Sequence, residues 1–320
     1  MKVLITGGAG FIGSYLAQEY EESGHEVTVL DNFSTGDLRN LQAINFHGEK
    51  VCGDIRDSSL VDSLVKSSDL VLHMAAALGV SNIMNSPLES MSTNITGSEV
   101  ILTAAAKYGK RILIASTSEI YGKNPKQPLS EEDDRVIGNP QNIRWSYSDS
   151  KAIEESMARA LNIQQGLPVT TVRFFNTVGP RQTGQYGMVL PKLVQSALNG
   201  KDLLVHGDGT QSRVFCHVVD AISAVITLVE TDKTIGEVYN VGGVGETSIN
   251  ELANNIISQS NSSSKIRHVP YSDVYPVGFE DMQRRVPNTD KIRSEIGWAP
   301  KKSLAEIIED VIAELKTNPE

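Results

Sequence analysis

The chain has 320 residues, of which 40% are hydrophobic and 21% charged, and its formal net charge is −10. This length allows a large core in one big domain or two closely packed ones, while an acidic chain with no block of basic residues argues against nucleic acid as a partner, because binding phosphates needs a Lys/Arg patch. No apolar run is long enough for a membrane span, the N-terminus starts with strand residues rather than a signal peptide, and the two cysteines form neither a disulfide framework nor a metal-type cluster, so we expect a cytoplasmic protein without a metal site.

The first predicted elements are a buried strand at 2–6 and a helix at 11–23, joined by a glycine-rich turn with the sequence Thr-Gly-Gly-Ala-Gly-Phe-Ile-Gly at 6–13. Gly7 permits a tight turn, Gly10 lets the backbone approach a pyrophosphate, and Gly13 lets helix and strand pack closely. The free N–H groups at the start of the helix would then face the phosphates. The turn therefore predicts a dinucleotide site.

A second apolar run at 26–31 ends in Asp31, 18 residues after Gly13. A carboxylate at this place can accept a hydrogen bond from a ribose 2′-OH, and its charge repels a 2′-phosphate. The pattern favours NAD over NADP.

Further strands and helices alternate along the first half of the chain. Strands are predicted at 51–53, 69–73, 111–116 and 169–174, and helices at 57–66, 86–107 and 146–165. This order predicts an α/β fold, a Rossmann-type doubly wound parallel sheet with ligands at the carboxyl ends of its strands. Gly7, Asp31, His73 and Ser116 all fall at such ends.

After about residue 176 the alternation loosens, glycine and proline become common, and the strands shorten. We expect an NAD-binding domain over 1–175. Residues 176–320 are expected to form mainly a smaller α/β substrate-binding lobe, with some segments returning to the sheet.

Tyr147 and Lys151 lie four residues apart in the helix predicted at 146–165, so their side chains share one face. A nearby ammonium together with a nicotinamide charge would lower the pKa of the Tyr147 phenol toward neutrality. Tyr147 could then act as general base on an alcohol. The strand at 111–116 ends in Ser116-Thr117-Ser118-Glu119, which offers hydroxyls and a carboxylate at the same edge of the sheet.

With these motifs the chain resembles the extended short-chain dehydrogenase/reductases that act on nucleotide sugars, over essentially its whole length. The resemblance rests on the turn at 6–13, Asp54, the Leu-His-Met-Ala-Ala run at 72–76, Asn94, the Tyr147/Lys151 pair, Arg-Phe-Phe-Asn-Thr-Val-Gly-Pro-Arg at 173–181 and His-Gly-Asp-Gly-Thr-Gln-Ser-Arg at 206–213.

The resemblance implies NAD as the cofactor and a nucleotide sugar, UDP-linked in our expectation, as the substrate. It implies catalytic roles for Thr117, Glu119, Tyr147 and Lys151. The implied cofactor site is Gly7, Gly10, Phe11, Ile12, Gly13, Asp31, Asn32, Asp54, Ile55, Ala75, Asn94, Tyr147 and Lys151. The implied substrate site is Thr117, Ser118, Asn176, Arg181, Arg213 and Arg285.

Oxidation at sugar C4 opens several related reactions. Hydride return to the opposite face gives a 4-epimerase, elimination across C5 and C6 gives a 4,6-dehydratase, and loss of CO₂ from a 4-keto uronic acid gives a decarboxylase. A glutamate at the position of Glu119 resembles the pattern of dehydratases and decarboxylases, whereas epimerases usually carry an uncharged residue there. Ser118 replaces the aspartic acid of dTDP-glucose dehydratases, and Asp31 argues against the NADP-preferring GDP-mannose dehydratases.

Three segments, 110–119, 144–147 and 278–287, are most similar to UDP-glucuronate decarboxylases, where an arginine matching Arg285 lies at the sugar. A cation beside a uronic carboxylate suits binding and orientation. Against this, Ile83 stands where those decarboxylases carry a tyrosine. We therefore predict a UDP-glucuronate decarboxylase, with a UDP-sugar 4-epimerase and then a 4,6-dehydratase as alternatives.

Two further hypotheses remain: an NAD-sensing protein on the same fold, which would typically lack Tyr147 or Lys151, and a simple oxidoreductase that releases NADH. The resemblance also implies a homodimer through a four-helix bundle built from the helices at 86–107 and 146–165. We expect Val100, Ile101 and Leu102 to supply apolar surface for it.

Overall fold

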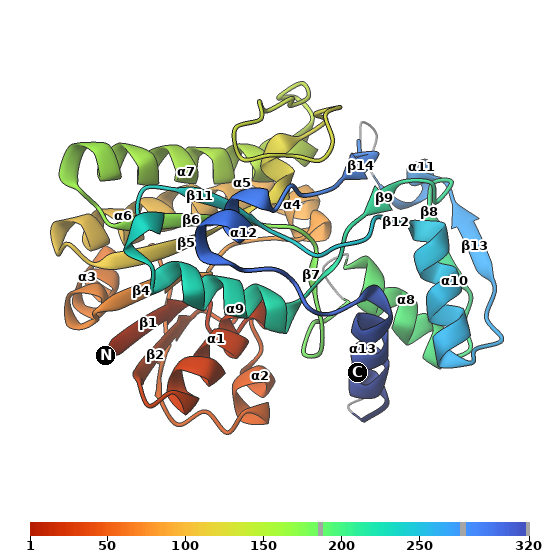
Figure 1. Cartoon of the computed structure of the whole chain (residues 1–320), viewed down its shortest axis with the longest axis horizontal. Helices are drawn as coiled ribbons and strands as arrows, with labels where there is room; N and C mark the ends of the chain where they lie inside the picture. Colours follow the sequence, from red (N-terminus) through yellow and green to blue (C-terminus); the bar gives the residue numbers. More distant parts are fainter. Residues whose placement is uncertain (185–187, 276–279, 318–320) are drawn as a thin grey trace.

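A computed structural model describes residues 1–184, 188–275 and 280–317 and has a central sheet of seven parallel strands (Figure 1). The strand order is β11-β6-β5-β4-β1-β2-β3, so the order reverses between β1 and β4. The strands are β1 (Lys2–Thr6), β2 (Glu26–Asp31), β3 (Glu49–Cys52), β4 (Leu70–His73), β5 (Arg111–Thr117), β6 (Val169–Phe174) and β11 (Val238–Val241). The predicted doubly wound sheet is confirmed, and its ligand edge lies at the carboxyl ends of β1 and β4.

Helices cover both faces of this sheet, which is why its central strands are apolar on both sides. On one face α1 (Phe11–Glu22), α2 (Leu38–Ala43) and α9 (Val218–Val229) share one apolar core with β1 and β2. On the other, α3 (Ser58–Ser67), α6 (Ser98–Lys107) and α7 (Ser146–Gln165) share a second core with β4 and β5. The helix α7 ends at Gly166, whose left-handed backbone closes its last turn.

The helix predicted at 86–107 consists of three successive segments. The α-helix α5 (Pro87–Ser92) passes into a π-helical turn, η1 (Thr93–Gly97), and then into α6. The wider turn contains Asn94, whose amide binds both the N–H and the C=O of Ala77. A π-turn in mid-helix commonly accommodates such a constraint.

The second half of the chain contributes to both parts of the molecule. A separate apolar core joins α8 (Val189–Leu198), β8 (Leu203–His206), α10 (Ile249–Ser260), β13 (Ile266–Val269) and α13 (Leu304–Thr317). However, β11 and α9 return to the sheet, and α12 (Asp290–Ile296) contributes Ile292 to the same core as α9. The division at residues 175/176 stays a prediction.

Short strands connect the two parts. The strand β9 (Ser212–Arg213) pairs with β12 (Thr247–Ser248) and with β14 (Arg284–Arg285), and this register places Arg213 opposite Arg285. A second small pair joins β7 (Thr177–Val178) to β10 (Cys216–His217). The remaining elements are α4 (Val80–Asn85), α11 (Tyr271–Val274), η2 (Ser118–Tyr121), η3 (Ile143–Trp145) and η4 (Asp232–Thr234).

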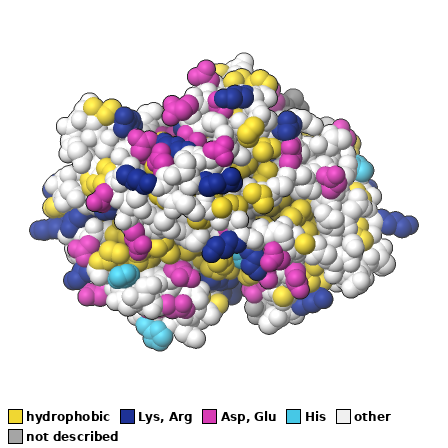
Figure 2. Space-filling model, viewed as in Figure 1, with side chains coloured by type: hydrophobic (Ala, Val, Ile, Leu, Met, Phe, Trp, Pro, Cys, Tyr) yellow, Lys and Arg dark blue, Asp and Glu magenta, His cyan; other side chains and the backbone are white. Residues whose placement is uncertain are grey.

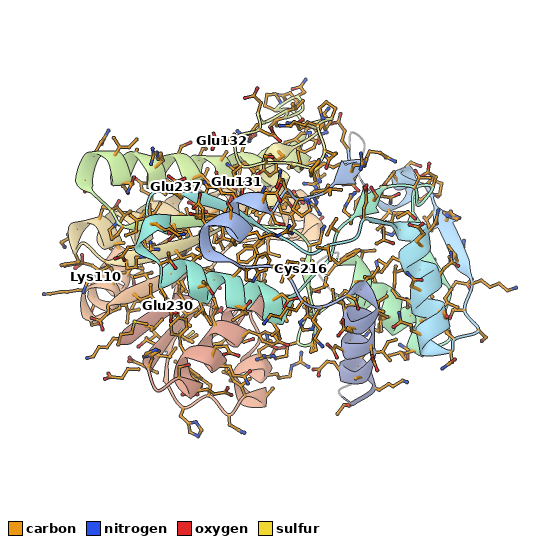
Figure 3. The ribbon with its side chains drawn as sticks, viewed as in Figure 1. Lys110, Glu131, Glu132, Cys216, Glu230 and Glu237 are labelled. Carbon is orange, nitrogen blue, oxygen red and sulfur yellow. The ribbon has the colours of Figure 1, made fainter. Side chains whose placement is uncertain are left out.

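Acidic side chains cover the outer edge strand β11. Glu131 accepts the backbone N–H of Asn240 at 2.8 Å, and Glu131 and Glu237 both lie close to this strand (Figure 3). Pairing an edge N–H with a carboxylate removes a donor that another strand could use. Cys216 lies near the centre of the molecule, where burial raises the pKa of its thiol (Figure 3).

Figure 2 shows Lys and Arg side chains interspersed with Asp and Glu over the face in view. Among the described residues, no helix combines the length and the apolar character needed to cross a bilayer.

Candidate active site

A single cavity of about 1460 Å³ extends from the carboxyl edge of the sheet into the C-terminal half of the chain. At one end the glycine turn and Asp31 line it, and at the other end Arg213 and Tyr275 do so. The strand-end residues Thr117 and Glu119 and the helix residues Tyr147 and Lys151 lie between these ends. Most of the predicted residues therefore share one cavity.

The glycine turn is packed too tightly for side chains. Gly7 has a φ of +68°, and a Cβ there would lie 2.7 Å from the backbone nitrogen of Ala75. At Gly13 a Cβ would lie 2.2 Å from the carbonyl oxygen of Gly7. With Phe11, Ile12 and the start of α1, the turn presents bare backbone to the cavity, as a pyrophosphate requires.

Asp31 ends β2 and stabilises this turn through hydrogen bonds to its backbone. Its carboxylate accepts the backbone N–H of Ala9 at 2.9 Å and that of Phe33 at 2.8 Å, and burial raises its pKa. A carboxylate with two donors still has free lone pairs for a ribose hydroxyl. Ile55 and Ala75 also line the cavity, so the chain's own residues fit NAD.

Three of the predicted cofactor residues hold the cavity wall in place. Asp54 is bonded to Arg56 at 2.7 Å, and this guanidinium lowers the pKa of Asp54 to about 2. Asn32 donates to the same carboxylate at 3.3 Å and lines the cavity, whereas Asp54 is not among the lining residues. Asn94 is 1% exposed and fixes the Ala77 backbone from behind. The predicted contact between Asp54 and adenine stays a prediction.

Tyr147 and Lys151 occupy the first turns of α7. The Thr117 hydroxyl lies beside the Tyr147 phenol and lowers its pKa, and Thr117 also accepts the backbone N–H of Glu119. The Lys151 ammonium is buried and binds the Glu154 carboxylate at 2.7 Å. Tyr147 and Lys151 both line the cavity, and so does Thr117, which the resemblance implied beside Tyr147.

The expected low pKa of Tyr147 is not found in the chain alone. Burial, followed by the charges of Glu119 and Glu154, raises the pKa of this phenol above its usual value. The spacing argument counted the Lys151 ammonium but not Glu154, which neutralises it. Any lowering must come from cations that oppose these carboxylates, of which Arg285 is one.

Glu119 lies between two guanidinium groups. Arg144, 2% exposed, binds both of its oxygens at 2.6 and 3.0 Å, and Arg285 approaches at 3.5 Å. Together they lower the pKa of Glu119 to about 2 against the opposing effect of burial. Glu119 is therefore ionised at every physiological pH, and two cations around one carboxylate leave a net positive charge here.

Of the predicted substrate residues, Asn176 accepts from the Arg285 guanidinium and donates to Val214. Arg213 binds Asp281 at 2.9 Å and lines the cavity, as does the buried Ser118. Arg181 instead lies against α1. Its guanidinium carbon is 3.3 Å from the centre of the Tyr15 ring, and it donates to Gln18. Arg181 also lines the cavity, and its contact with a substrate stays a prediction.

Sequence reasoning did not include Arg144, Glu154, Asp281 or the aromatic residues at the far end of the cavity. There His206 binds the Tyr275 hydroxyl at 3.0 Å, and Tyr271 packs against Tyr275. No local spacing indicates these residues. Arg144 does lie in the segment 144–147, which resembles UDP-glucuronate decarboxylases. Gly278 and Phe279 of the 278–287 segment lie outside the described residues.

The chain is similar to known sequences over nearly its whole length. A family profile described as GDP-mannose 4,6 dehydratase matches residues 4–311. The UDP-N-acetyl-alpha-D-glucosaminuronate decarboxylase of Bacillus cytotoxicus is 43% identical, over 97% of this chain and 96% of that protein. UDP-glucuronic acid decarboxylase 1 of Danio rerio is 35% identical, over 95% of this chain and 70% of that protein.

Solved structures share the fold. The UDP-glucuronic acid 4-epimerase of Bacillus cereus, crystallised with UDP-glucuronic acid and NAD, is similar with a TM-score of 0.89 and 26% identity. The match covers 99% of each chain.

Proposed function

The chain belongs to the GDP-mannose 4,6 dehydratase family of extended short-chain dehydrogenase/reductases, whose cofactor is NAD, and from this membership we propose that it decarboxylates a UDP-linked hexuronic acid. The observation that carries the reaction is the cationic group around Glu119. Arg285 lines the cavity together with Tyr147, and its side chain is 13% exposed. A guanidinium in the cavity wall suits a substrate carboxylate.

The chain's own residues supply binding and proton transfer. Bound NAD provides the oxidising and then the reducing equivalents at sugar C4. The Tyr147 oxygen takes the proton of the C4 hydroxyl, and Thr117 hydrogen-bonds this oxygen and the sugar. Arg285 orients the uronic carboxylate, and Arg213 holds the diphosphate through its charge.

Oxidation at C4 places a ketone β to the carboxylate on C5. The bond between C5 and the carboxyl carbon then breaks, CO₂ leaves, and the electron pair moves into the enolate whose oxygen lies at Tyr147 and Thr117. A proton from solvent is added to C5 in place of the lost carboxyl group, and reduction at C4 takes back the proton held by Tyr147. Glu119, ionised between two arginines, acts by fixing Arg285 rather than by exchanging a proton.

The sugar is proposed from the relatives. The 43% identical relative acts, by its name, on UDP-N-acetylglucosaminuronate, and the 35% identical relative on UDP-glucuronate. We favour the 2-acetamido sugar for this chain, with UDP-glucuronate as the second substrate.

A 4-epimerase is the alternative reaction. Ile83 is 2% exposed and lines the cavity where a phenol was expected, which weakens selection for an acidic sugar. The structural similarity to the Bacillus cereus epimerase fits this reading. A 4,6-dehydratase comes third, because Ser118 offers a hydroxyl where an acid is needed.

We also propose that the protein is a cytoplasmic homodimer. Its two cysteines are free thiols, which suits a reducing compartment. The dimer would use α5 and α7, but not as first expected: Ile101 and Leu102 are fully buried in the subunit's own core. The large apolar side chains that are exposed on the described α5 and α7 include Leu88, Ile153 and Ile163.

The test is product analysis with UDP-N-acetylglucosaminuronate, UDP-glucuronate and UDP-glucose. A decarboxylase gives a product lighter by one CO₂ from a uronic acid, whereas an epimerase leaves the mass unchanged and inverts C4. Arg285→Ala should slow turnover of the uronic substrate by about 10- to 100-fold, as the loss of a charged hydrogen bond predicts.

Arg284→Ala is the matched control, because Arg284 is exposed and pairs with Glu246 at the surface. It should leave turnover unchanged. Interconversion of epimers without any mass loss would contradict decarboxylation.

A further inference from the structure

Glu154 is a buried carboxylate for which the reaction described above has no role. It lies three residues after Lys151 on α7 and is 0% exposed. Its Oε2 binds the Lys151 ammonium at 2.7 Å, and both side chains of this pair are almost completely shielded from water. Lys151 therefore reaches the cavity already attached to an acid.

The ion pair continues into a column of buried polar side chains. Ser98 on α6 is a polar neighbour of Glu154, and its hydroxyl lies 3.0 Å from Nε2 of His73 at the end of β4. The other ring nitrogen of His73 lies 2.7 Å from the hydroxyl of Thr6, which directly precedes Gly7. The column thus joins the catalytic helix to the glycine turn through four elements of the fold.

Stability alone does not account for this carboxylate. Its Oε1 is buried without a hydrogen-bond partner among the described residues, and burial raises its pKa. A buried ion pair of this kind commonly adds little net stability compared with a well-packed apolar side chain. Such groups are frequent at sites where charge has a functional effect.

We propose that Glu154 is a positioning residue: its carboxylate holds the Lys151 ammonium in place and sets the pH range in which Tyr147 serves as the base. This rests on the proposed role of Tyr147 and Lys151. Glu154 touches neither the phenol nor the cavity, and it acts through Lys151 and through its charge.

The direction of the expected pH shift follows from the charged groups that face the Tyr147/Lys151 pair. Glu154 lies on α7 itself, Glu119 approaches from η2, Arg285 from β14 and His73 from β4. Glu155, also on α7, acts on Glu154 and is paired with Arg173. Burial and Lys151 lower the pKa of His73 to about 3, so its ring stays neutral above that pH. A carboxylate beside two coupled acids favours their protonated forms, so removing its charge makes the first proton leave at lower pH.

The first experiment measures single-turnover C4 oxidation against pH, from the near-ultraviolet absorbance of the reduced cofactor. In Glu154→Gln the rise of this rate on the acidic side of the pH profile, the acid limb, should move to lower pH by about one unit. This is the scale expected for one charge lost near a buried site. Glu154→Met, neutral but apolar, should shift it in the same direction and serves if the glutamine variant does not fold.

Glu155→Gln is the matched control. Glu155 is the next residue on α7 and pairs with Arg173 at 2.7 Å, away from Lys151. The Glu155→Gln substitution removes the same charge from the same helix, and the acid limb of this variant should stay close to that of the native chain.

The second experiment does not use turnover. Ultraviolet difference titration of the chain without cofactor, with and without Tyr147→Phe, isolates the ionisation of this phenol. The same comparison in the Glu154→Gln background should show ionisation at lower pH by about one unit. If neither profile moves, if either moves to higher pH, or if Glu155→Gln moves them equally, the proposal is wrong. A native chain that oxidises no UDP-sugar would instead refute the proposed function, and the titration would still decide the role of Glu154.

Discussion

At the scale of single residues, the site is organised by the way carboxylates partner its cations. Arg285 faces Glu119, Arg213 faces Asp281, and Lys151 faces Glu154. Each cation is thereby held in one geometry before any ligand arrives, which reduces the ordering cost of binding. Glu119 and Asn176 restrain the Arg285 guanidinium, which still lines the cavity.

The residue on which turnover depends most directly is Tyr147. We expect Tyr147→Phe to lower the rate by about 10²–10⁴-fold, the usual contribution of a positioned acid or base, because the ring stays and only the proton carrier is lost. NAD and nucleotide-sugar binding, measured by calorimetry, should change little. Turnover within a few fold of the native chain would show that another group is the base, and Lys151→Met should be at least as damaging.

At the scale of elements, the junction of β1 and α1 determines whether a dinucleotide can bind. The turn works because α1 starts directly over the strand, with Gly13 against the backbone of Gly7 and Gly8. The ladder between β1 and β2 and the Asp31 contact to Ala9 then hold this turn against its neighbours. Backbone atoms, unlike flexible side chains, cannot move aside.

We therefore expect Gly13→Ala to displace α1 from β1. The substitution should destabilise the chain by about 1–3 kcal/mol, the usual cost of overpacking, and weaken NAD binding. Thermal unfolding with and without NAD measures both effects. The control is Glu19→Ala on the exposed side of the same helix, which should change neither; an unchanged NAD affinity in Gly13→Ala would contradict the packing argument.

At the scale of the whole molecule, apolar side chains on neighbouring helices point to assembly. Leu88 on α5 is 81% exposed, and Ile153 and Ile163 on α7 are 42% and 67% exposed. Exposed apolar groups gathered on adjacent helices are typical of an interface between subunits.

We predict a dimer in light scattering at micromolar concentration, and a monomer for the double variant Ile153→Lys with Ile163→Glu, because charges would be buried without partners. Val244→Glu, which alters an equally exposed apolar residue in the other half of the chain, should leave the dimer intact. A native chain that is monomeric at this concentration would rule the interface out.

The sequence by itself determined the elements and motifs that have a strong local signal. The strands at 2–6, 26–31 and 169–174, the helix at 146–165, the glycine turn and the shared face of Tyr147 and Lys151 follow from local spacing, and the structure has them. The π-turn at 93–97 could not be predicted from local spacing, because its cause is the contact of Asn94 with Ala77 in another segment.

Only the tertiary structure decided which charges meet. Glu119 is joined to Arg285 across 166 positions, Ser98 to His73 beside Glu154, and Arg181 to Tyr15 on the dinucleotide helix. These contacts raise the pKa of Tyr147 in the chain alone and set Arg181 against α1. The physical reason is that electrostatic environments depend on burial and on distances in space, which spacing along the chain does not specify.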